Sequence, residues 1–233
     1  MKNALNWTLA IVFGLTLIPA LILSAADGVM FSAQLYRRAY EKYDRPAAIG
    51  IDPDDLMDVT QRLLGYMKGR EPDLIIEKEI GGVAQEVFGE RERLHMVDVR
   101  RLVLGAMRIR LLCAAAAVLC LAALAVRLRG GAIAHLTRGF LWSLAVWGAL
   151  LAALGIYILV DFSGAFWNFH LLFFDNDLWL LDPETDVMIN MFPEAFFNDM
   201  ALAIVWRAAL FIAIPAIGAA LLVRREKTHD RLS

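Results

Sequence analysis

Long apolar runs alternate with charged segments along this chain, and this pattern gives its first structural prediction. Each of four runs approaches the roughly 20 residues that a helix needs to cross about 30 Å of hydrocarbon. The predicted transmembrane helices cover residues 1–30, 102–126, 140–160 and 200–223. Arg108 and Arg110 interrupt the start of the second run, where their long side chains can reach the headgroup region.

The first run has an alternative interpretation as a cleaved signal peptide. Lys2 precedes the apolar residues, and "LSAADG" (Leu23 to Gly28) has small residues at a spacing typical of cleavage sites. We favour a retained helix because the run is longer than a usual signal core. Pro19 inside it is tolerated where neighbouring helices satisfy the backbone groups that it leaves free.

Residues 31–101 have the pattern of a small folded segment between the first two spans. "IDPDDLMDVTQRLLGYMKG" (Ile51 to Gly69) has Asp52 as an N-cap, Pro53 at the first helical position and apolar residues at helical spacing. It predicts an amphipathic helix. The helical spacing returns at Glu90 to Met107 and leads into the second span.

Two short apolar runs lie between these helices. "LIIEKEI" (Leu74 to Ile80) and "VAQEVF" (Val83 to Phe88) flank the pair Gly81-Gly82. We interpret them as one strand pair that turns at the glycines. Residues 31–101 therefore predict a small α+β cap.

The composition agrees with a membrane protein. Hydrophobic residues make up 59% of the 233 residues, whereas about 45–50% is usual in soluble domains. Cys113 and Cys120 lie about 10 Å apart along one predicted helix, too far for a disulfide. The sequence contains no glycine-rich phosphate loop, paired-cysteine metal motif or nucleophile elbow, and we expect no nucleic-acid partner.

Basic residues predict the orientation of the spans. The connection 127–139 is basic, without an acidic residue, and the tail 224–233 is also rich in basic residues. The residues concerned are Arg127, Arg129, Arg138, Arg224, Arg225, Lys227 and Arg231. Such segments face the cytoplasm, so both termini are predicted there, and the cap 31–101 and the acidic loop 161–199 outside.

The predicted fold class is therefore an α-helical integral membrane protein, with a four-helix transmembrane bundle and a small α+β extracytoplasmic cap. The same orientation separates the four histidines. His135 and His229 fall on the cytoplasmic side, among basic residues. His95 and His170 share the outer side, so these two are the candidates for a common site.

Charged residues accompany His95 on its predicted helix. Glu92, His95 and Asp98 recur every three residues and lie on one face, followed by Arg100 and Arg101. Such a pattern alone is also typical of a solvated charged face that contains an incidental histidine.

Aromatic residues accompany His170 in the loop 161–199. Phe166, Trp167, Phe169, Phe173, Phe174 and Trp179 are the ones nearest to it in sequence. We expect this loop to lie along the outer headgroup region, with its rings in the acyl boundary. One interpretation is an interfacial anchor; the other is one wall of a lipid-accessible site with His170 directed at the lipid.

Two stretches of the sequence resemble the signature regions of a known family. "LHMVDVRRL" (Leu94 to Leu102) and "FHLLFFDNDLWLLDPETDVMINMFPEAFFNDM" (Phe169 to Met200) are similar to those of the bacterial lipoprotein intramolecular transacylases, the Lit family. The order of one span, an external cap and three further spans also matches. The first span and most of the cap offer no motif to compare.

This resemblance implies a defined reaction in the bacterial cytoplasmic membrane. The substrate would be a lipoprotein whose N-terminal cysteine carries a diacylglyceryl thioether and a free amine. One acyl chain moves from the glyceryl sn-2 oxygen to that amine, which gives the lyso-form N-acyl lipoprotein. The implied partners are this lipoprotein and membrane lipids, and the active site would lie at the outer leaflet.

The candidate residues suit this chemistry. We predict His170 as the principal general base and acid, and His95 as a second proton carrier or oxyanion donor, although the two roles could be reversed. Glu92 or Asp98 would orient His95, and Arg100 or Arg101 would stabilise negative charge.

Two alternatives stay open at this point. The scheme requires no cofactor and no metal, but two histidines with nearby carboxylates are also ligands that a metal-activated hydrolase could use. The chain could instead be a non-enzymatic membrane protein that docks lipids or lipoproteins at its outer face. The sequence does not indicate an oligomeric state.

Overall fold

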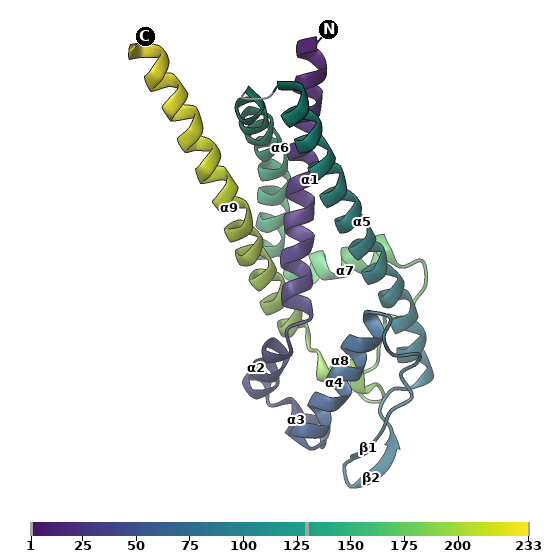
Figure 1. Ribbon diagram of the computed structural model, residues 1–233. Helices are drawn as coiled ribbons and strands as arrows, with labels where there is room; N and C mark the ends of the chain where they lie inside the picture. Colours follow the sequence, from purple (N-terminus) through teal and green to yellow (C-terminus); the bar gives the residue numbers. More distant parts are fainter. Residues whose placement is uncertain (1, 129–130, 233) are drawn as a thin grey trace. The chain divides into compact units, whose positions relative to one another are not determined.

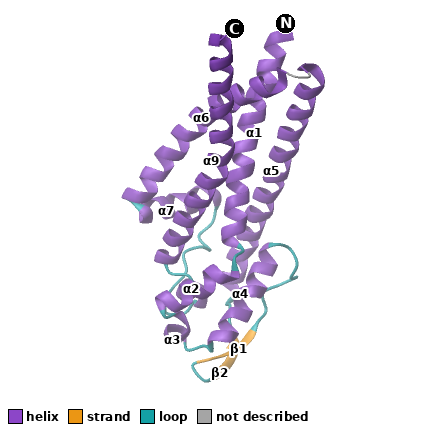
Figure 2. Cartoon of the chain, turned by 60° about the vertical axis from the view of Figure 1, so that its left-hand side comes forward, coloured by secondary structure: helices purple, strands orange, loops and turns teal. Residues whose placement is uncertain are grey.

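The computed structural model describes residues 2–128 and 131–232, which form helices and a single β-hairpin (Figures 1 and 2). These residues fall into two compact units. The helical unit comprises Met1–Asp27, Met107–Val160 and Ile204–Ser233. The mixed unit comprises Gly28–Ala106 and Asp161–Ala203.

Four long helices supply the helical unit, and all four are apolar enough to cross a membrane. They are α1 (Lys2–Met30), α5 (Glu90–Leu128), α6 (Ala132–Val160) and α9 (Glu194–Leu232). Large apolar side chains such as Leu112, Leu119 and Ile214 are exposed on them, as expected of surfaces that contact lipid. The predicted fold class, four spanning helices with a small α+β part, is confirmed.

Small residues allow α1 and α6 to pack closely within the helical unit. A Cβ atom on Gly139 of α6 would overlap the backbone carbonyl of Ala10 in α1. Four residues later, the Ser143 hydroxyl donates to the carbonyl of Ile11 at 3.1 Å. Close approach through small residues, supported by interhelical hydrogen bonds, is how helices associate in lipid, where no hydrophobic force drives them together.

One ion pair lies among the spanning helices of this unit. Arg110 of α5 contacts Asp27 of α1 at 3.0 Å, and both side chains are mostly buried. Arg110 thus has an acidic partner in addition to the predicted reach toward headgroups. A paired charge is the form in which an ionised side chain is tolerated beside hydrocarbon.

The mixed unit contains the shorter elements. These are α2 (Ala33–Tyr43), α3 (Arg45–Ile49), α4 (Pro53–Met67), β1 (Glu77–Ile80), β2 (Val83–Glu86), α7 (Phe162–Phe173) and α8 (Val187–Met191). The first turns of α5 and α9 complete it.

The sequence signals of the segment 31–101 act as predicted. Asp52 caps α4 by accepting the backbone N–H groups of Asp54 and Asp55, and Pro53 occupies the first turn. The strands pair antiparallel, with Ile80 opposite Val83. Gly81 and Gly82 both have positive φ, which glycine adopts without a steric cost and which a two-residue hairpin turn requires.

Helix α2 has no counterpart among the predicted elements. It buries Tyr36, Ala39 and Tyr40 on one face, and the Tyr40 hydroxyl shares a 2.7 Å hydrogen bond with Thr60 of α4. Its remaining residues are largely charged, so no long apolar run marks it in the sequence.

The connections between spans are more helical than expected. Helix α6 begins at Ala132, within the predicted loop 127–139, because Ala132 and Leu136 bury against Ala10 and Leu124. The predicted loop 161–199 contains α7, α8 and the start of α9. Arg129 lies outside the described residues, as do the side chains of Arg225, Lys227, His229 and Arg231.

The close approach of α1 and α6 can be tested with two glycines of one helix. Gly139→Ala should lower the free energy of unfolding by about 1–3 kcal/mol, because the added methyl group has no space. Gly148 has nothing within 4 Å of a built Cβ, so Gly148→Ala should leave stability unchanged or raise it. Thermal unfolding of both variants in detergent measures the difference, and equal midpoints would contradict the packing described.

Candidate active site

The charged beginning of α5 carries the first candidate histidine. The residues from Glu90 to Arg101 precede the apolar stretch of this helix. His95 nevertheless has only 8% of its surface exposed. A solvated charged face with an incidental histidine, one of the two interpretations above, is therefore wrong for this residue.

The second candidate histidine lies on α7, far away in the sequence. Asp161 begins this helix as its N-cap and accepts the backbone N–H of Gly164 at 2.8 Å. His170 is the one buried residue of α7, also with 8% exposed. The fold brings the rings of His95 and His170 together, with centroids 6.3 Å apart and planes inclined by 31°.

A backbone carbonyl fixes the tautomer of His170. Its Nδ1 lies 2.7 Å from the carbonyl oxygen of Phe166, one turn earlier in α7. A carbonyl oxygen only accepts hydrogen bonds, so Nδ1 carries the proton. In the neutral ring, Nε2 is then the atom with a free lone pair and is the basic position of the side chain.

Aromatic rings surround the His170 imidazole. Trp179 stacks on it, with ring centroids 4.6 Å apart and ring planes inclined by 27°. Phe166 meets it edge-on, with ring centroids 4.4 Å apart. Phe174 lies 5.6 Å from it and 5.2 Å from His95, and so contacts both histidines. These contacts contribute to the burial of His170, which is 8% exposed.

Both histidines are held neutral by this environment. Burial lowers the pKa of His170, although the Phe166 carbonyl opposes the change. Burial, and next the proximity of His170, lower the pKa of His95 to about 4, with Asp98 acting in the opposite direction. At neutral pH the site therefore contains two uncharged imidazoles, which are bases and hydrogen-bond donors rather than cations.

One ring nitrogen of His95 has no protein partner. Among the described residues, Nδ1 of His95 is buried and makes no hydrogen bond. An unpaired buried polar atom costs about 1–3 kcal/mol, and such atoms in native proteins call for a specific explanation. This nitrogen is available to a group that enters the site.

Glu92 has a different role from the one predicted. Only 1% of the residue is exposed, and its two carboxylate oxygens accept the backbone N–H groups of Gly89 and Met188, each at 2.6 Å. The first bond caps α5 and the second ties it to α8. Burial raises the pKa of this carboxyl group while the two backbone bonds oppose the change. Glu92 thus holds the scaffold of the site and does not orient His95 directly.

Asp98 and the two arginines contact other groups. Asp98 accepts a 2.9 Å hydrogen bond from the Asn176 side chain and pairs with Arg101, which is 79% exposed. The guanidinium of Arg100 lies over the Tyr66 ring at 4.6 Å. These contacts do not support the predicted charge-stabilising roles of the arginines, and they leave Asp98 as an electrostatic neighbour of His95.

The six predicted lipid-facing aromatic residues divide into two groups. Trp167, Phe169 and Phe173 are exposed on α7, as expected. Phe166 and Trp179 are partly buried and Phe174 is buried, and these three surround the histidines. Sequence alternation alone could not separate them, because the loop that carries Trp179 folds back on α7.

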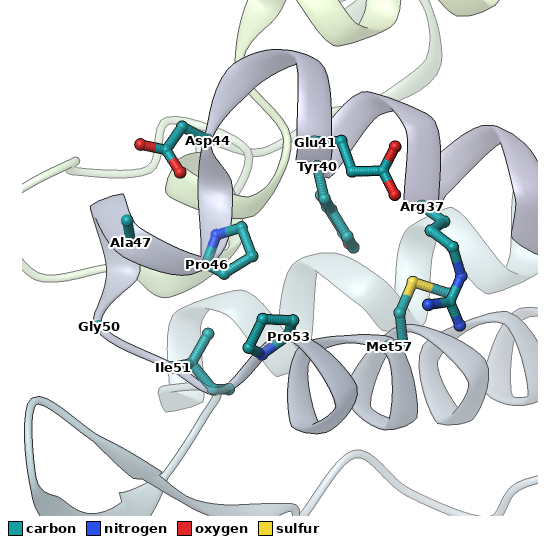
Figure 3. Close-up of a pocket in the computed structure, with 10 residues that line it drawn as sticks. All are labelled: Arg37, Tyr40, Glu41, Asp44, Pro46, Ala47, Gly50, Ile51, Pro53 and Met57. Carbon is teal, nitrogen blue, oxygen red and sulfur yellow. The ribbon is translucent and has the colours of Figure 1, made fainter.

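The described residues contain no cluster of three or more His, Cys, Asp or Glu side chains suited to a metal ion. The metal-free scheme stays a prediction. A separate cavity of about 640 Å³ lies in the mixed unit, lined by residues of α2, α3 and α4 that include Arg37, Tyr40 and Met57 (Figure 3). Neither histidine lines this cavity.

The fold and the site define an integral membrane protein with a pair of buried, uncharged histidines. The sequence model of the lipoprotein intramolecular transacylase Lit matches residues 11–197, and the chain belongs to this family. It is therefore a membrane transacylase, and the non-enzymatic docking alternative is not favoured. A direct comparison with curated protein sequences found no match.

Solved structures agree with this family at the level of the fold. The in meso structure of the Lit transacylase from Bacillus cereus has 22% sequence identity and a TM-score of 0.74, and the comparison covers 99% of this chain and 100% of that one. A variant of the same protein with a histidine replaced by arginine has 20% identity and a TM-score of 0.73, covering 98% and 96% of the two chains.

The scaffolding role of Glu92 makes a stability prediction. Glu92→Ala should lower the free energy of unfolding by about 2–4 kcal/mol, because the buried N–H of Met188 and the partly buried N–H of Gly89 lose their acceptor. Glu90→Ala, in the same helical turn but exposed, should change it by about 0.5 kcal/mol or less. Thermal unfolding in detergent distinguishes them, and similar losses in both variants would contradict this role.

The lowered pKa of His95 predicts how stability depends on pH. The unfolded chain binds a proton near pH 6.5 and the folded one only near pH 4. The contribution of the neutral His95 ring to the free energy of unfolding is fully present above pH 6.5. It is lost as the pH falls toward 4, and the total loss is about 3 kcal/mol at most. His95→Gln should therefore flatten the dependence of the unfolding midpoint on pH in this window. A slope identical to that of the wild type would contradict the assignment.

Proposed function

We propose that this transacylase moves the sn-2 acyl chain of a diacylglyceryl lipoprotein to the α-amine of its N-terminal cysteine, with His170 as general base and acid. The observation that carries the proposal is the tautomer of His170. Its Nδ1 donates to the Phe166 carbonyl, so Nε2 is free to accept a proton. Membership of the Lit family supports the reaction type.

The reaction exchanges an ester for an amide within one molecule. The neutral amine attacks the ester carbonyl carbon, a C–N bond forms, and the carbonyl oxygen becomes an oxyanion. Nε2 of His170 takes the proton that the nitrogen must lose. The C–O bond to the glycerol then breaks and the same proton passes to the glyceryl oxygen. The products are an N-acyl cysteine and a free hydroxyl, with the number of acyl chains unchanged.

The lowered pKa of His170 suits a base that must be neutral at the start of the reaction. An α-amine has an ordinary pKa of about 7.7–8.0, so near neutral pH part of the substrate is already uncharged. Proton transfer by a positioned side chain contributes about 10²–10⁴-fold to the rate. The buried site adds to this because water does not compete for the proton.

His95 is better suited to donate a hydrogen bond to the oxyanion than to carry the proton. Its pKa of about 4 leaves it uncharged, and its buried Nδ1 has no partner among the described residues. A neutral imidazole N–H that meets the developing negative charge gains its hydrogen bond in the transition state rather than in the resting enzyme. This difference supports His170 as the base and His95 as the donor, in preference to the reverse assignment.

The structure of the substrate itself accounts for much of the remaining rate enhancement. Amine and ester belong to the same lipid-modified cysteine, so the enzyme has only to hold them in a geometry ready for attack. The exposed rings of Trp167, Phe169 and Phe173 near His170 are suited to contact with acyl chains. The scheme uses no cofactor.

We place this site at the outer leaflet of the bacterial cytoplasmic membrane, with both termini in the cytoplasm. The support is the distribution of charge in the sequence. Arg127 and Arg138 flank a connection without acidic residues, whereas the loop 161–199 contains no lysine or arginine. A translocated loop is expected to have this composition.

Mass spectrometry of a lipopeptide tests the reaction. The wild type, expressed in a host that makes only the diacylglyceryl form, should yield a lyso species with one N-linked chain. His170→Ala should reduce that product by about 10²–10⁴-fold, and His95→Gln should also reduce it. His135→Ala is the control, since His135 lies on α6 near Trp7 and not in the site.

The outcomes separate the parts of the proposal. A lipopeptide that stays diacylglyceryl with a free amine, despite verified membrane insertion of the wild type, would refute the reaction. An active wild type with an equally active His170→Ala variant would keep the reaction and remove His170 as its base.

A further inference from the structure

Asn176 makes more hydrogen bonds than an ordinary turn residue needs. Its side-chain amide donates to Asp98 of α5 at 2.9 Å, and its side-chain oxygen accepts the backbone N–H of Leu178 at 3.1 Å. Its backbone carbonyl accepts the indole N–H of Trp179 at 3.0 Å. Asparagine is common in turns, where a single bond from its side-chain oxygen to the backbone N–H two residues later is sufficient.

The indole bond connects Asn176 to the general base. Trp179 stacks on the His170 ring at 4.6 Å. The indole has its one polar atom fixed by the Asn176 carbonyl, so the position of the Asn176 backbone sets the position of the stacked ring. Trp179 also meets Trp167 of α7 edge-on at 4.8 Å.

The side-chain bond connects Asn176 to the helix that carries the second histidine. Asp98 follows His95 by three residues, about one turn along α5. The Asn176–Asp98 bond therefore fixes the loop after α7 against α5 at the level of the histidine pair. The neighbouring Arg91 also bonds this loop, at the Asp177 carbonyl, but it lies one turn before His95.

We propose that Asn176 is a positioning residue of the transacylase, which through its bond to Asp98 aligns Trp179 against the base His170. The inference rests on the proposed function of His170. Asn176 does not touch the reacting atoms. It acts by keeping the indole on the imidazole and water away from it.

Loss of this link should change the chemistry of the base as well as the rate. Burial is what lowers the pKa of His170. If Trp179 moves away, water reaches the ring and its pKa returns toward the ordinary value. In a plot of kcat/KM against pH, the fall in activity on the acid side (the acid limb) should then shift to higher pH. The other titratable groups that face His170 are His95 and Asp98 of α5. An aspartate at position 176 adds a carboxylate to them, whereas exchanging Asp98 and Asn176 keeps the net charge of the wild type.

A charge-swap experiment isolates the link. Asn176→Asp retains an acceptor for Leu178 and the carbonyl for Trp179, but its carboxylate faces that of Asp98 and cannot donate to it. The double variant Asp98→Asn with Asn176→Asp restores one donor and one acceptor with their places exchanged. Arg101 loses its charged partner in the swap, which matters little for an exposed ion pair.

Asn190→Asp is the matched control. Asn190 lies on α8, and its amide donates to the carbonyls of Pro183 and Asp186 in the loop before that helix; among the described residues its side chain makes no bond to α5. It loosens the loop without breaking the link to Asp98. Turnover of a diacylglyceryl lipopeptide in detergent is followed for each variant by mass spectrometry between pH 5 and 9.

The expected result is a fall in kcat of about 10²-fold for Asn176→Asp with little change in KM, since misplacement by about 1 Å has this effect. Its acid limb should move to higher pH. The swap should return kcat to within about threefold of the wild type, and Asn190→Asp should leave the acid limb unchanged.

Three results would overturn the inference. One is an acid limb in Asn176→Asp that coincides with that of the wild type, even if stability is reduced. Another is a swap that stays as slow as the single variant while both are folded. The third, absence of product from the wild type, would remove the proposed function and this inference together.

Discussion

Two buried imidazoles 6.3 Å apart impose the condition on which the rest of the site depends: burial lowers the pKa of both rings and so favours their uncharged forms at neutral pH. A proton on one would face a second ring and a wall of aromatic side chains, without water to solvate it. The fold must therefore supply neutral hydrogen-bonding groups where many acid–base sites use a carboxylate. The carbonyl of Phe166 is such a group for His170, whereas Nδ1 of His95 has no partner among the residues that the structure describes.

The same condition explains where the acidic residues lie. Glu92 is one turn from His95 and fully buried, yet both of its oxygens bind backbone N–H groups. Asp98, one turn further on, divides its oxygens between Asn176 and Arg101. Each carboxylate is satisfied away from the rings, and each fixes one other segment of the mixed unit to α5, Glu92 through Met188 and Asp98 through Asn176. Negative charge here serves to assemble the scaffold while the histidines stay uncharged.

Much of this arrangement follows from local signals in the sequence. Hydropathy alone located the four spans, the Asp52 and Pro53 pair began α4, and Gly81-Gly82 turned the hairpin. These features depend on residues that are close together in the chain. The prediction that His95 and His170 share a site rested instead on the charge distribution and the family resemblance of the whole chain, and the fold does bring the two rings together.

Other features depend on partners that are distant in sequence, and periodicity does not reveal these. The acceptor for Met188 is Glu92, 96 residues earlier, and the donor to Asp98 is Asn176, 78 residues later. Arg100 follows Asp98 in the sequence but is directed at Tyr66 instead of the histidines. Helix α2 is held by Tyr40 and Thr60, whose contact appears only when the two helices are packed.

The Phe166 carbonyl has a consequence for the tolerance of the site to mutation. In sites where an aspartate orients a histidine, a single amino-acid substitution can remove the acceptor, and the histidine can then adopt the wrong tautomer. Here the acceptor belongs to the peptide bond, and every amino acid placed at position 166 supplies it as long as α7 stays helical. The protonation pattern of His170 is therefore encoded by the helix and not by a side chain. Sequence drift around His170 can alter packing and lipid contact while the imidazole keeps its lone pair on the same nitrogen.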